Sequence, residues 1–510
     1  MRGRRSVQGF GLPAAHRGCQ GGPVRGGGGA VPIEASDRGR DGAADGLAIA
    51  GLVLALCLVL LARYGIVTPP DTGSFVDSAD ALMRPGGLSG DATLREDAIP
   101  RAFYRPPLYP LLIAAARGIS GTAWPWLLVA LQLALATLAT VAFHRGLLAL
   151  CRVRWLAALG ALAQATTFAL ATHVAILADS LYASLLCLAA AVLLLRGMGG
   201  GLGAGGALLV GTLLGTGTLL REVGAYTGLL WLPLVAVAAL PRGRRAACVA
   251  VLAALLPMTC VVGGMLAWNV ARTGEAFLTT VGQVVYFQAL LPLAGRGLMV
   301  FAADPVLAAA ASEAMQAMTL PEVDRLNRLL FSEYGLNAIQ ISRLAQRAWR
   351  LAWQDHPLPM LLATLERIKG HHALTLFLPL ENAAHVGLWA EGVPPLLARF
   401  DRLLRAALGG RELGLVPLAL AALACRAVAA ALFVCYLLVP WRAWCARGEQ
   451  AARLALATWS VWPATLLLHA LVHLEIRYFA PVLPLAIAGA VWVAAVTRVP
   501  GMPRSAAPRT

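Results

Sequence analysis

Apolar runs that contain almost no charged residue recur along the whole chain of 510 residues. Most approach the roughly 20 residues that an α-helix needs to cross the hydrocarbon core of a bilayer. Their limits are residues 47–67, 124–144, 155–172, 180–195, 204–220, 223–240, 246–268, 413–440, 454–469 and 479–497. The pattern predicts an all-α fold, a polytopic transmembrane helical bundle of about ten helices. Two longer charged stretches, residues 71–105 and 272–411, interrupt it.

The second charged stretch contains apolar positions with the spacing of a helix, within residues 320–356. These positions are Leu326, Leu329, Leu330, Ile339, Ile341, Leu344 and Ala348. Because residues three and four apart share one helical face, we expect short amphipathic helices that lie over the mouth of the bundle. A folded soluble cap outside the membrane is the alternative.

The composition agrees with a bilayer environment. Hydrophobic residues make up 59% of the chain and charged residues 13%, with a mean hydropathy of +0.70, whereas a soluble domain carries about 25% charged residues. The net charge of +16 would indicate a nucleic-acid partner in a soluble protein. Here the apolar runs argue for the lipid bilayer as partner, and no nucleic acid is expected.

The arginines indicate which side of the membrane each loop occupies. With a cytoplasmic N-terminus, the predicted inner segments hold most arginines, and the three short outer turns hold only Arg221 and Arg477. Basic residues concentrate in cytoplasmic loops. Both charged stretches therefore belong outside, within a first outer loop of residues 68–123 and a large outer loop of residues 269–412.

The chain divides accordingly into a membrane domain between two tails. Residues 1–45 are rich in Gly and Arg without periodicity, which predicts a disordered basic cytoplasmic tail; a misassigned start is the alternative. Residues 46–497 form the expected membrane-embedded domain. Residues 498–510 form a short cytoplasmic tail.

Two charged residues mark the ends of the first charged stretch. Asp71 follows two prolines just beyond the first apolar run, where a carboxylate is anchored yet wet enough to stay ionised, as a general base must be. Arg105 lies between Tyr104 and a Pro–Pro step, which restricts its backbone, so it suits pairing with a phosphate or an acid. A solvated loop acid and an arginine that reaches for lipid headgroups are the alternatives.

Further charges interrupt the apolar segments. Asp179 lies between two very apolar runs, where an acid at a helix centre costs about 2.5–3.5 kcal/mol; it either faces a polar cavity or caps the next helix. Arg221 either belongs to a tight turn or points into a cavity shared with Asp71 and Asp179. Glu475 and Arg477 stand at the mouth of the last helix, two residues apart and so on different helical faces.

No motif indicates a metal or a nucleotide site. His469 and His473 are four residues apart on one helical face, but the sequence offers no matching third ligand, and His371 and His372 are equally isolated. The nine cysteines are scattered without metal-site or disulfide spacing. Nucleotide-driven transport and hydrolase chemistry lack their usual signatures, since no Walker loop, GxSxG or HExxH is present.

Taken in order, these features resemble the GT-C glycosyltransferases, in particular the protein O-mannosyltransferases and the lipid A aminoarabinose transferase of the glycosyltransferase family 39 type. The matching segments are Asp71-x3-Phe75-x3-Ala79, Arg105-x-Pro107-x-Tyr109-Pro110, Asp179-Ser180-Leu181, Arg221, Trp268 to Gly274, and Glu475-x-Arg477-Tyr478 with prolines following. Phe75 stands where that family usually has Tyr, Asp179 where it has Glu, and Glu222 where Pro follows the Arg. These departures leave the subfamily and the sugar open.

The resemblance implies a cell-envelope glycosyltransferase, for hexoses or pentoses, at the extracytoplasmic face of a bacterial-type inner membrane. It would move a sugar from a polyprenyl-phosphate donor to a lipid, glycan or protein acceptor with inversion, and Asp71 would be the catalytic base. The implied substrate-binding residues are Arg105, Tyr109, Asp179, Arg221, Glu475, Arg477 and Tyr478. The resemblance implies no cofactor with certainty and leaves a divalent cation open.

Two other classes share the apolar pattern. A secondary transporter also carries intramembrane charges, but transporters usually show paired internal repeats and broken helices. The sequence shows no clear repeat, and two long outer loops exceed what transport needs. A non-catalytic envelope-assembly protein would keep the fold without the activity, and the retained Asp71 argues against it.

Overall fold

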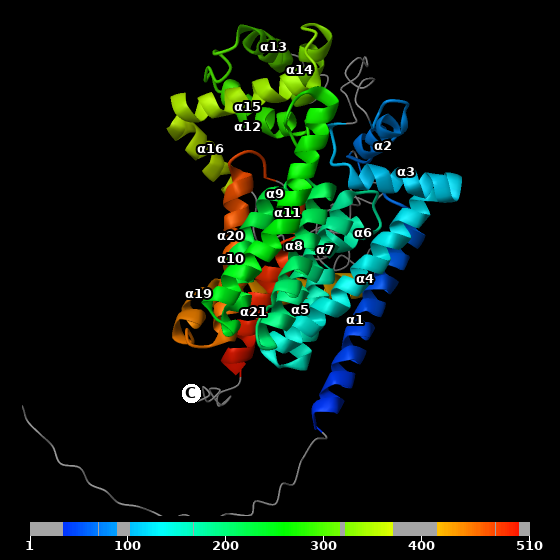
Figure 1. The fold of residues 1–510 in the computed structure, drawn as a ribbon, viewed down its shortest axis with the longest axis vertical. Coiled ribbons are helices and arrows are strands. Elements are labelled where there is room, and N and C mark those ends of the chain that lie inside the picture. Colours follow the sequence, from blue (N-terminus) through cyan, green and yellow to red (C-terminus); the bar gives the residue numbers. More distant parts are fainter. Residues whose placement is uncertain are drawn as a thin grey trace, which may run out of the picture. The chain divides into compact units, whose positions relative to one another are not determined.

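The computed structural model describes residues 34–69, 71–88, 103–166, 168–316, 322–370, 416–474 and 476–498. The chain divides into two units, residues 1–41 and 42–510, and only the start of helix α1 is described in the first. Every regular element in the described ranges is a helix (Figure 1), and the one β contact among them is an isolated parallel bridge between Val67 and Ala175. The predicted all-α class is confirmed.

The second unit is built around a bundle of apolar helices. They are α1 (Glu34–Tyr64), α4 (Trp124–Cys151), α5 (Arg154–Ala165), α6 (Phe168–His173), α7 (Ala178–Met198), α8 (Ala204–Leu220), α9 (Gly224–Leu230), α10 (Leu232–Ala239), α11 (Arg244–Thr273), α19 (Val416–Cys445), α20 (Gln450–Ala470) and α21 (Leu483–Arg498). Among the described residues, six helical segments are long and apolar enough to cross a membrane, and shorter apolar helices such as α8 accompany them. The chain is therefore a multi-pass membrane protein, as predicted.

Small residues allow the bundle helices to approach one another closely. Helix α7 is the most enclosed of the six long segments, because 78% of its most apolar 18-residue stretch is buried inside the molecule. A Cβ on Gly146 of α4 would lie 3.3 Å from the Cα of Ala191 on α7, and a Cβ on Gly211 of α8 would lie 2.1 Å from the carbonyl oxygen of Ala254 on α11. Because lipid tails are as apolar as Leu side chains, close packing drives helix association inside a bilayer.

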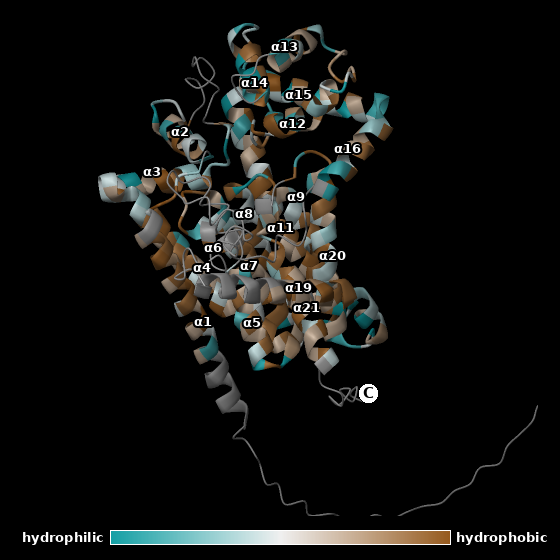
Figure 2. Cartoon of the chain, turned by 180° about the vertical axis from the view of Figure 1, so that it is seen from behind, coloured by the Kyte–Doolittle hydropathy of each residue, from teal (hydrophilic) through white to brown (hydrophobic). Residues whose placement is uncertain are grey.

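A second group of helices, here called the cap layer, lies beyond one end of the bundle and carries more hydrophilic residues (Figure 2). It consists of α12 (Gly282–Ala294), α13 (Pro305–Gln316), α14 (Glu322–Ser332), α15 (Ala338–Asp355) and α16 (Pro357–Gly370). Phe287, Leu326 and Ile341 are buried in an apolar core of its own. A capping box between Asn337 and Gln340 begins α15. The predicted amphipathic helices are confirmed by α14 and α15, whose apolar faces enter this core.

The predicted first outer loop, residues 68–123, contains two helices, α2 (Asp71–Met83) and α3 (Leu108–Ser120). Helix α3 is amphipathic: Tyr109, Ile113 and Ala116 are buried on one face. The short 3₁₀ turn Gly121–Ala123 joins α3 directly to α4. The loop expected before the second membrane span is therefore a helical structure that lies on the bundle.

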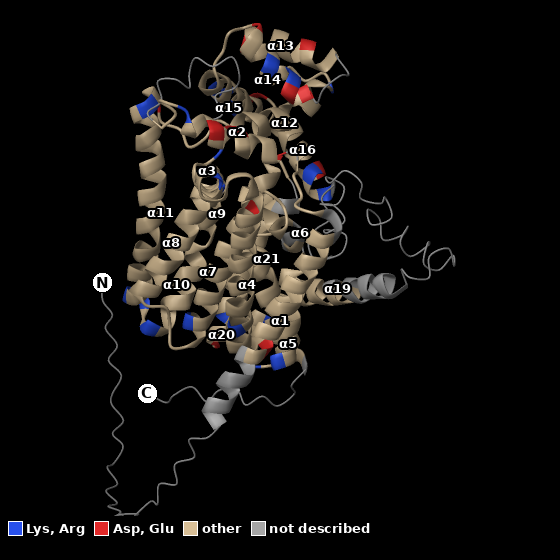
Figure 3. Ribbon diagram, turned by 90° about the vertical axis from the view of Figure 1, so that its right-hand side faces the viewer, with Lys and Arg blue, Asp and Glu red and all other residues tan. Residues whose placement is uncertain are grey.

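The two charged stretches contact each other at one end of the bundle, here called the loop end. The backbone N–H of Thr280 donates to the carbonyl of Phe103 at 2.9 Å. The Arg272 guanidinium lies 3.6 Å from the ring centre of Trp268 and 4.3 Å from that of Phe103. Basic residues, blue in Figure 3, gather at the opposite end of the bundle near α10. Which side of the membrane each end faces stays a prediction.

Two runs that the sequence analysis treated as single helices are broken. Residues 155–172 form α5 and α6, and the hydroxyl of Thr166 at the break donates to the carbonyl of Leu162 at 2.7 Å. Such a side-chain bond competes with the regular helix ladder. Residues 223–240 form α9 and α10, and Pro233 lies in the first turn of α10, where its missing N–H does no harm.

Candidate active site

Asp71 begins a helix of its own and does not continue the first one. Helix α1 ends at Tyr64, and Gly65 then takes a positive φ of +69°, so the chain turns away. The N–H of Thr72 donates to the carbonyl of Pro69 at 2.8 Å and closes the turn that leads into α2. Asp71 lies in the first turn of α2, where the helix dipole stabilises a negative charge.

Arg105 holds the Asp71 carboxylate. Its Nη2 lies 3.0 Å from Oδ1 of Asp71, and the Asp71 side chain is 25% exposed, whereas that of Arg105 is 7% exposed. The Nε of Arg105 donates to the hydroxyl of Ser74 at 2.8 Å, and that hydroxyl donates to the Asp71 carbonyl at 2.7 Å. Arg105 is therefore paired with an acid, one of the two partners expected for it, and the carboxylate is oriented yet accessible.

Aromatic rings fix the position of Arg105. Its guanidinium carbon lies 4.6 Å from the ring centre of Phe75 and 5.1 Å from that of Tyr104, distances at which a cation is attracted to a ring face. Phe75 in turn packs edge-on against Tyr109 at 5.0 Å. Tyr109 is fully buried, and its hydroxyl donates to Oε1 of Gln132 at 2.9 Å. Tyr109 thus lies one layer behind the charged groups.

Gln132 on α4 brings the second acidic segment to the same place. Its side-chain amide donates to the carbonyls of His173 at 3.2 Å and Ala175 at 2.9 Å. The hydroxyl of Thr72 donates to the carbonyl of Ile176 at 3.0 Å. These bonds, together with the bridge at Val67, fix the chain before α7 against the start of α2. The segment that leads into Asp179 is therefore held beside Asp71.

Asp179 and Arg221 form a buried ion pair. Nη1 of Arg221 lies 3.3 Å from Oδ2 of Asp179, and the two side chains are 5% and 4% exposed. Asp179 lies in the first turn of α7, whose N-cap is Leu177 without a side-chain bond, so the alternative of a capping aspartate is wrong. Arg221 is the C-cap of α8. Each charge lies at the helix end whose dipole favours it.

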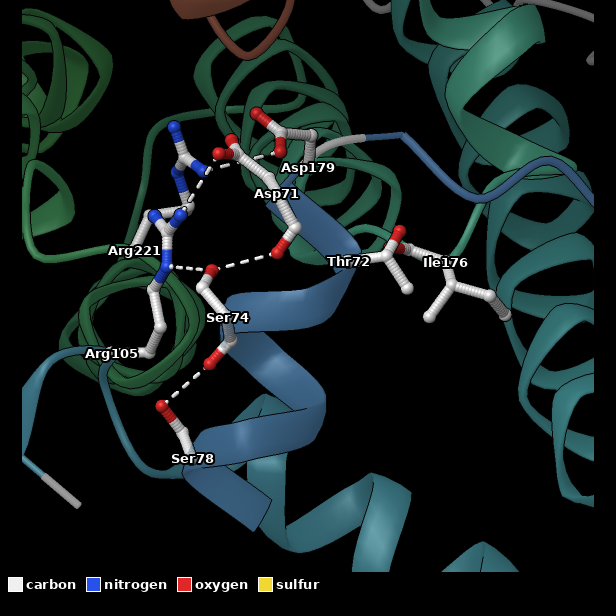
Figure 4. Close-up of polar contacts among 8 residues, drawn as sticks. All are labelled: Asp71, Thr72, Ser74, Ser78, Arg105, Ile176, Asp179 and Arg221. Carbon is white, nitrogen blue, oxygen red and sulfur yellow. Dashed lines mark hydrogen bonds and ion pairs between the residues drawn. The ribbon is translucent and has the colours of Figure 1, made fainter. Parts of the chain in front are cut away.

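The four charges converge at the loop end of the bundle. In Figure 4 the carboxylates of Asp71 and Asp179 and the guanidinium groups of Arg105 and Arg221 point toward one another beside the first turn of α2. Segments more than a hundred residues apart thus bring two carboxylates and two guanidinium groups to one place. Such a site can accept a proton at a carboxylate and bind a phosphate at a guanidinium.

A cavity of about 520 Å³ lies between the cap layer and the bundle. Arg221 and Glu222 line it from the turn between α8 and α9, and Tyr286 and Trp349 line it from the cap layer. Neither Asp71 nor Arg105 is among the lining residues, so Arg221 is the charge that joins the cavity to the Asp71 cluster. Burial raises the pKa of the Tyr286 phenol, which therefore stays protonated at neutral pH and can donate a hydrogen bond.

Tyr478 closes the cavity beside α20. It belongs to the 3₁₀ turn Ile476–Phe479, and the Arg221 guanidinium carbon lies 5.8 Å from its ring centre. His469 stacks on this ring at 4.6 Å, and His473 meets its edge at 6.1 Å. The two histidines thus share an aromatic partner. Within the described residues, no three His, Cys, Asp or Glu side chains gather as a metal site.

Two of the expected site residues cannot be placed. Glu475 lies outside the described residues, and Arg477 is described only through its backbone in the turn with Tyr478. The sequence analysis also missed Ser74 and Gln132, which bond directly to the site. Gln132 had a detectable signal, since it is an amide within an otherwise apolar run. Ser74 had none, because a serine in a polar stretch is unremarkable.

Comparison with known proteins gives few matches. No family model matches the chain, and no curated protein matches it. Two matching solved structures are ArnT from Cupriavidus metallidurans bound to undecaprenyl phosphate, 14% identical over 88% of this chain and 77% of that one with a TM-score of 0.32, and the same protein in the apo state, 17% identical over 86% and 78% with a TM-score of 0.31. ArnT belongs to the superfamily that the motifs resemble. At TM-scores this low the likeness carries no argument, and the function proposed below rests on motifs and site geometry.

Proposed function

We propose that the protein is a membrane glycosyltransferase that moves a sugar from a polyprenyl-phosphate donor to an acceptor hydroxyl with inversion. The observation that carries this proposal is the cluster of Asp71, Arg105, Asp179 and Arg221 beside a cavity at the loop end of a membrane bundle. The donor class comes from the motif resemblance. A donor with a lipid tail also accounts for a polar site at the end of a membrane bundle.

Asp71 is the proposed general base. Its carboxylate is accessible, and Arg105 at 3.0 Å fixes its orientation. It would take the proton of the acceptor hydroxyl as that oxygen attacks the anomeric carbon opposite the phosphate. Proton transfer by a positioned carboxylate contributes about 10²–10⁴-fold to a rate.

Arg221 is the proposed ligand of the leaving phosphate. A guanidinium carries five N–H donors in a planar fork that matches phosphate oxygens, and Asp179 fixes its orientation at the cavity wall. Charge stabilisation of this kind is usually the largest contribution to catalysis. If the donor lies in the cavity and the acceptor hydroxyl lies on the side of Asp71, the base and the leaving phosphate are on opposite faces of the sugar.

The remaining predicted residues take supporting roles in this proposal. Tyr109 is a positioning residue that acts through Phe75 and Arg105, since its own surface is buried. Tyr478 offers a ring face beside Arg221. Glu475 and Arg477 keep the substrate-binding roles that the motif implies.

The extracytoplasmic side of a bacterial-type inner membrane is the proposed location of the site. We assign the membrane-embedded domain to residues 46–497. Its acceptor would be a lipid, glycan or protein of the cell envelope. These assignments rest on the arginine distribution and on the motif resemblance.

The experiment that tests the function is a transfer assay in membranes. Membranes with the wild-type protein or with Asp71→Asn are supplied with labelled polyprenyl-phosphate sugars, and label in acceptor products is counted. Asn keeps the shape of the carboxylate but cannot accept the proton, so we expect a loss of about 10²–10⁴-fold. Asp77→Asn is the matched control, because Asp77 is an exposed acid on the same helix, and its effect should be mild.

The outcomes separate the proposal from its rivals. Normal transfer by Asp71→Asn with a strong loss in Asp77→Asn would move the base to Asp77. Normal transfer by both variants would remove α2 from the chemistry. Absence of any transfer by the wild type would favour a transporter or a non-catalytic protein.

A further inference from the structure

Glu222 is the one carboxylate among the described residues that line the cavity. It follows Arg221 at the turn between α8 and α9. Its Oε2 atom is buried and makes no hydrogen bond to any group in the described part of the chain. A buried carboxylate oxygen without a donor is costly. A ligand that supplies the missing donor would recover that cost.

The rest of the wall suits a ring that carries hydroxyl groups. Tyr226, Tyr286 and Trp349 contribute aromatic surface, and the ring centres of the last two lie 5.5 Å apart. Gln346 and Ser342 of α15 add an amide and a hydroxyl. A sugar presents C–H faces that pack on aromatic rings and hydroxyl groups at its edge that need polar partners.

Charge restricts which sugar fits. Arg221 and Glu222 are consecutive, so their Cα atoms are about 3.8 Å apart, and their side chains meet neighbouring parts of one ligand. The guanidinium suits the phosphate, whereas the carboxylate suits hydrogen-bond donors. A carboxylate on the sugar would face Glu222, whose Oε2 is buried, and the two like charges would repel each other.

We propose that Glu222 is a specificity-determining residue: it accepts hydrogen bonds from the hydroxyl groups of a neutral sugar and disfavours sugars that bear a carboxylate. The inference rests on the proposed function, which places a sugar phosphate in this cavity. To that function it adds the class of the transferred sugar and the residue that selects this sugar. Glu222 stands where the resembling family usually has Pro, so the selectivity belongs to this chain.

Binding measurements on the purified full chain in detergent test this inference without requiring transfer. The probes are farnesyl phosphate, farnesyl-phosphoglucose and farnesyl-phosphogalactose, and the two corresponding uronates, each titrated by calorimetry. The neutral sugar that binds more tightly is compared with its own uronate. We expect the wild type to prefer the neutral probe by about tenfold or more, the worth of one hydrogen bond to a charged group.

Glu222→Gln should lower the affinity for the probe with the neutral sugar by about tenfold. The difference between this affinity and that for the corresponding uronate should become smaller, while the affinity for bare farnesyl phosphate stays unchanged. The matched control is Glu313→Gln on α13, an acid of the cap layer that pairs with Arg325 outside the cavity lining. This control should leave all affinities at their wild-type values.

Each contrary result has its own meaning. Equal binding of neutral sugar and uronate by the wild type overturns the role of Glu222 and leaves the proposed function standing. So does a Glu222→Gln variant whose affinity for farnesyl phosphate falls by as much as its affinity for the neutral sugar, because Glu222 would then only support the site. Failure of the wild type to bind any probe, farnesyl phosphate included, overturns the proposed function and this inference together.

Discussion

The ion pair between Asp179 and Arg221 is about 95% buried on both sides. Removing two charges from water costs several kcal/mol for each ion, so a buried pair is often no more stable than apolar residues of the same volume. Its value here is geometric. The carboxylate fixes one edge of the guanidinium, which then faces the cavity beside Tyr478. The same logic applies to Arg105, which Ser74 and Asp71 hold on two sides.

Substitutions of Arg221 should distinguish the effect of its positive charge from that of its planar guanidinium group. Arg221→Lys keeps a cation beside Asp179 but loses the planar fork, so the protein should fold while needing about tenfold more donor for half-maximal transfer. Arg221→Ala leaves the buried Asp179 charge without its partner and should cost about 3–5 kcal/mol of stability. Transfer at graded donor concentrations and thermal unfolding in detergent report the two effects.

The control for Arg221 is Arg117→Lys. Arg117 forms an exposed pair with Asp80, and exposed pairs contribute about 0–1 kcal/mol. The donor concentration needed for half-maximal transfer and the thermal stability of this variant should both stay near the wild-type values. A wild-type donor requirement in Arg221→Lys, together with normal stability in Arg221→Ala, would show that Arg221 neither binds phosphate nor needs Asp179.

At the scale of single residues, the sequence identifies the charged residues of the site better than it identifies the partners of these residues. Asp71, Asp179 and Arg221 stand out because a charge beside an apolar run is costly and calls for a reason. Their partners lie 34 residues away for Asp71 and 42 residues away for Asp179. Bonds such as that from Thr72 to Ile176, 104 residues further on, hold the two segments together. Gln132 carries no charge, yet it ties Tyr109 to the segment that leads into Asp179. Neutral polar residues of this kind give a weak signal in sequence.

At the scale of elements, the bundle depends on backbone contacts between helices. Helices α8 and α11 approach so closely at Gly211 that an added Cβ would lie 2.1 Å from the carbonyl oxygen of Ala254. Real Cβ atoms do not come so near backbone oxygen, so any side chain there must push the helices apart. Helix α8 carries Arg221 at its C-terminal end, so its position also sets that of the site.

Gly211→Ala should therefore destabilise the bundle. Overpacking by one methyl group typically costs about 1–3 kcal/mol, and the apparent Tm in detergent should fall accordingly. Gly263→Ala on α11 is the matched control, because no atom lies within 4 Å of its added Cβ and Ala has the higher helix propensity. Equal Tm values for the two variants would contradict the close approach of α8 and α11.

The apolar runs predict where helices exist but not where they break. Residues 155–172 and 223–240 contain no charged residue, so each appears as one continuous run, although Thr166 follows α5 and Pro233 stands in the first turn of α10. The breaks follow from local bonds, such as that of Thr166, and from Pro233 at the start of α10. Helix α3 was missed because its polar flanks resemble a loop, although its buried face is regular.

At the scale of the whole molecule, the second unit, residues 42–510, brings the described parts of both charged stretches to one end of the bundle. The cap layer is tied to α20, since Arg367 donates to the carbonyl of Ala470 at 2.8 Å and Trp349 donates to that of Leu471 at 3.3 Å. These bonds hold Trp349 over the cavity that Arg221 lines from below. The arginine distribution predicted that the two stretches share one side of the membrane, which stays a prediction, and their described parts contact each other at this end of the bundle. It did not predict the cavity between the cap layer and the bundle.

The orientation of this end in the membrane is the last prediction. Ser332 on α14 is exposed in the cap layer, and Cys445 is an exposed thiol at the end of α19, where the arginines Arg442 and Arg447 lie. Since basic residues favour the cytoplasm, a variant whose only thiol is Ser332→Cys should react with an impermeant maleimide on intact cells. A variant that keeps only Cys445 should react after permeabilisation alone. The reverse pattern would place the Asp71 cluster in the cytoplasm and exclude an extracytoplasmic transfer reaction.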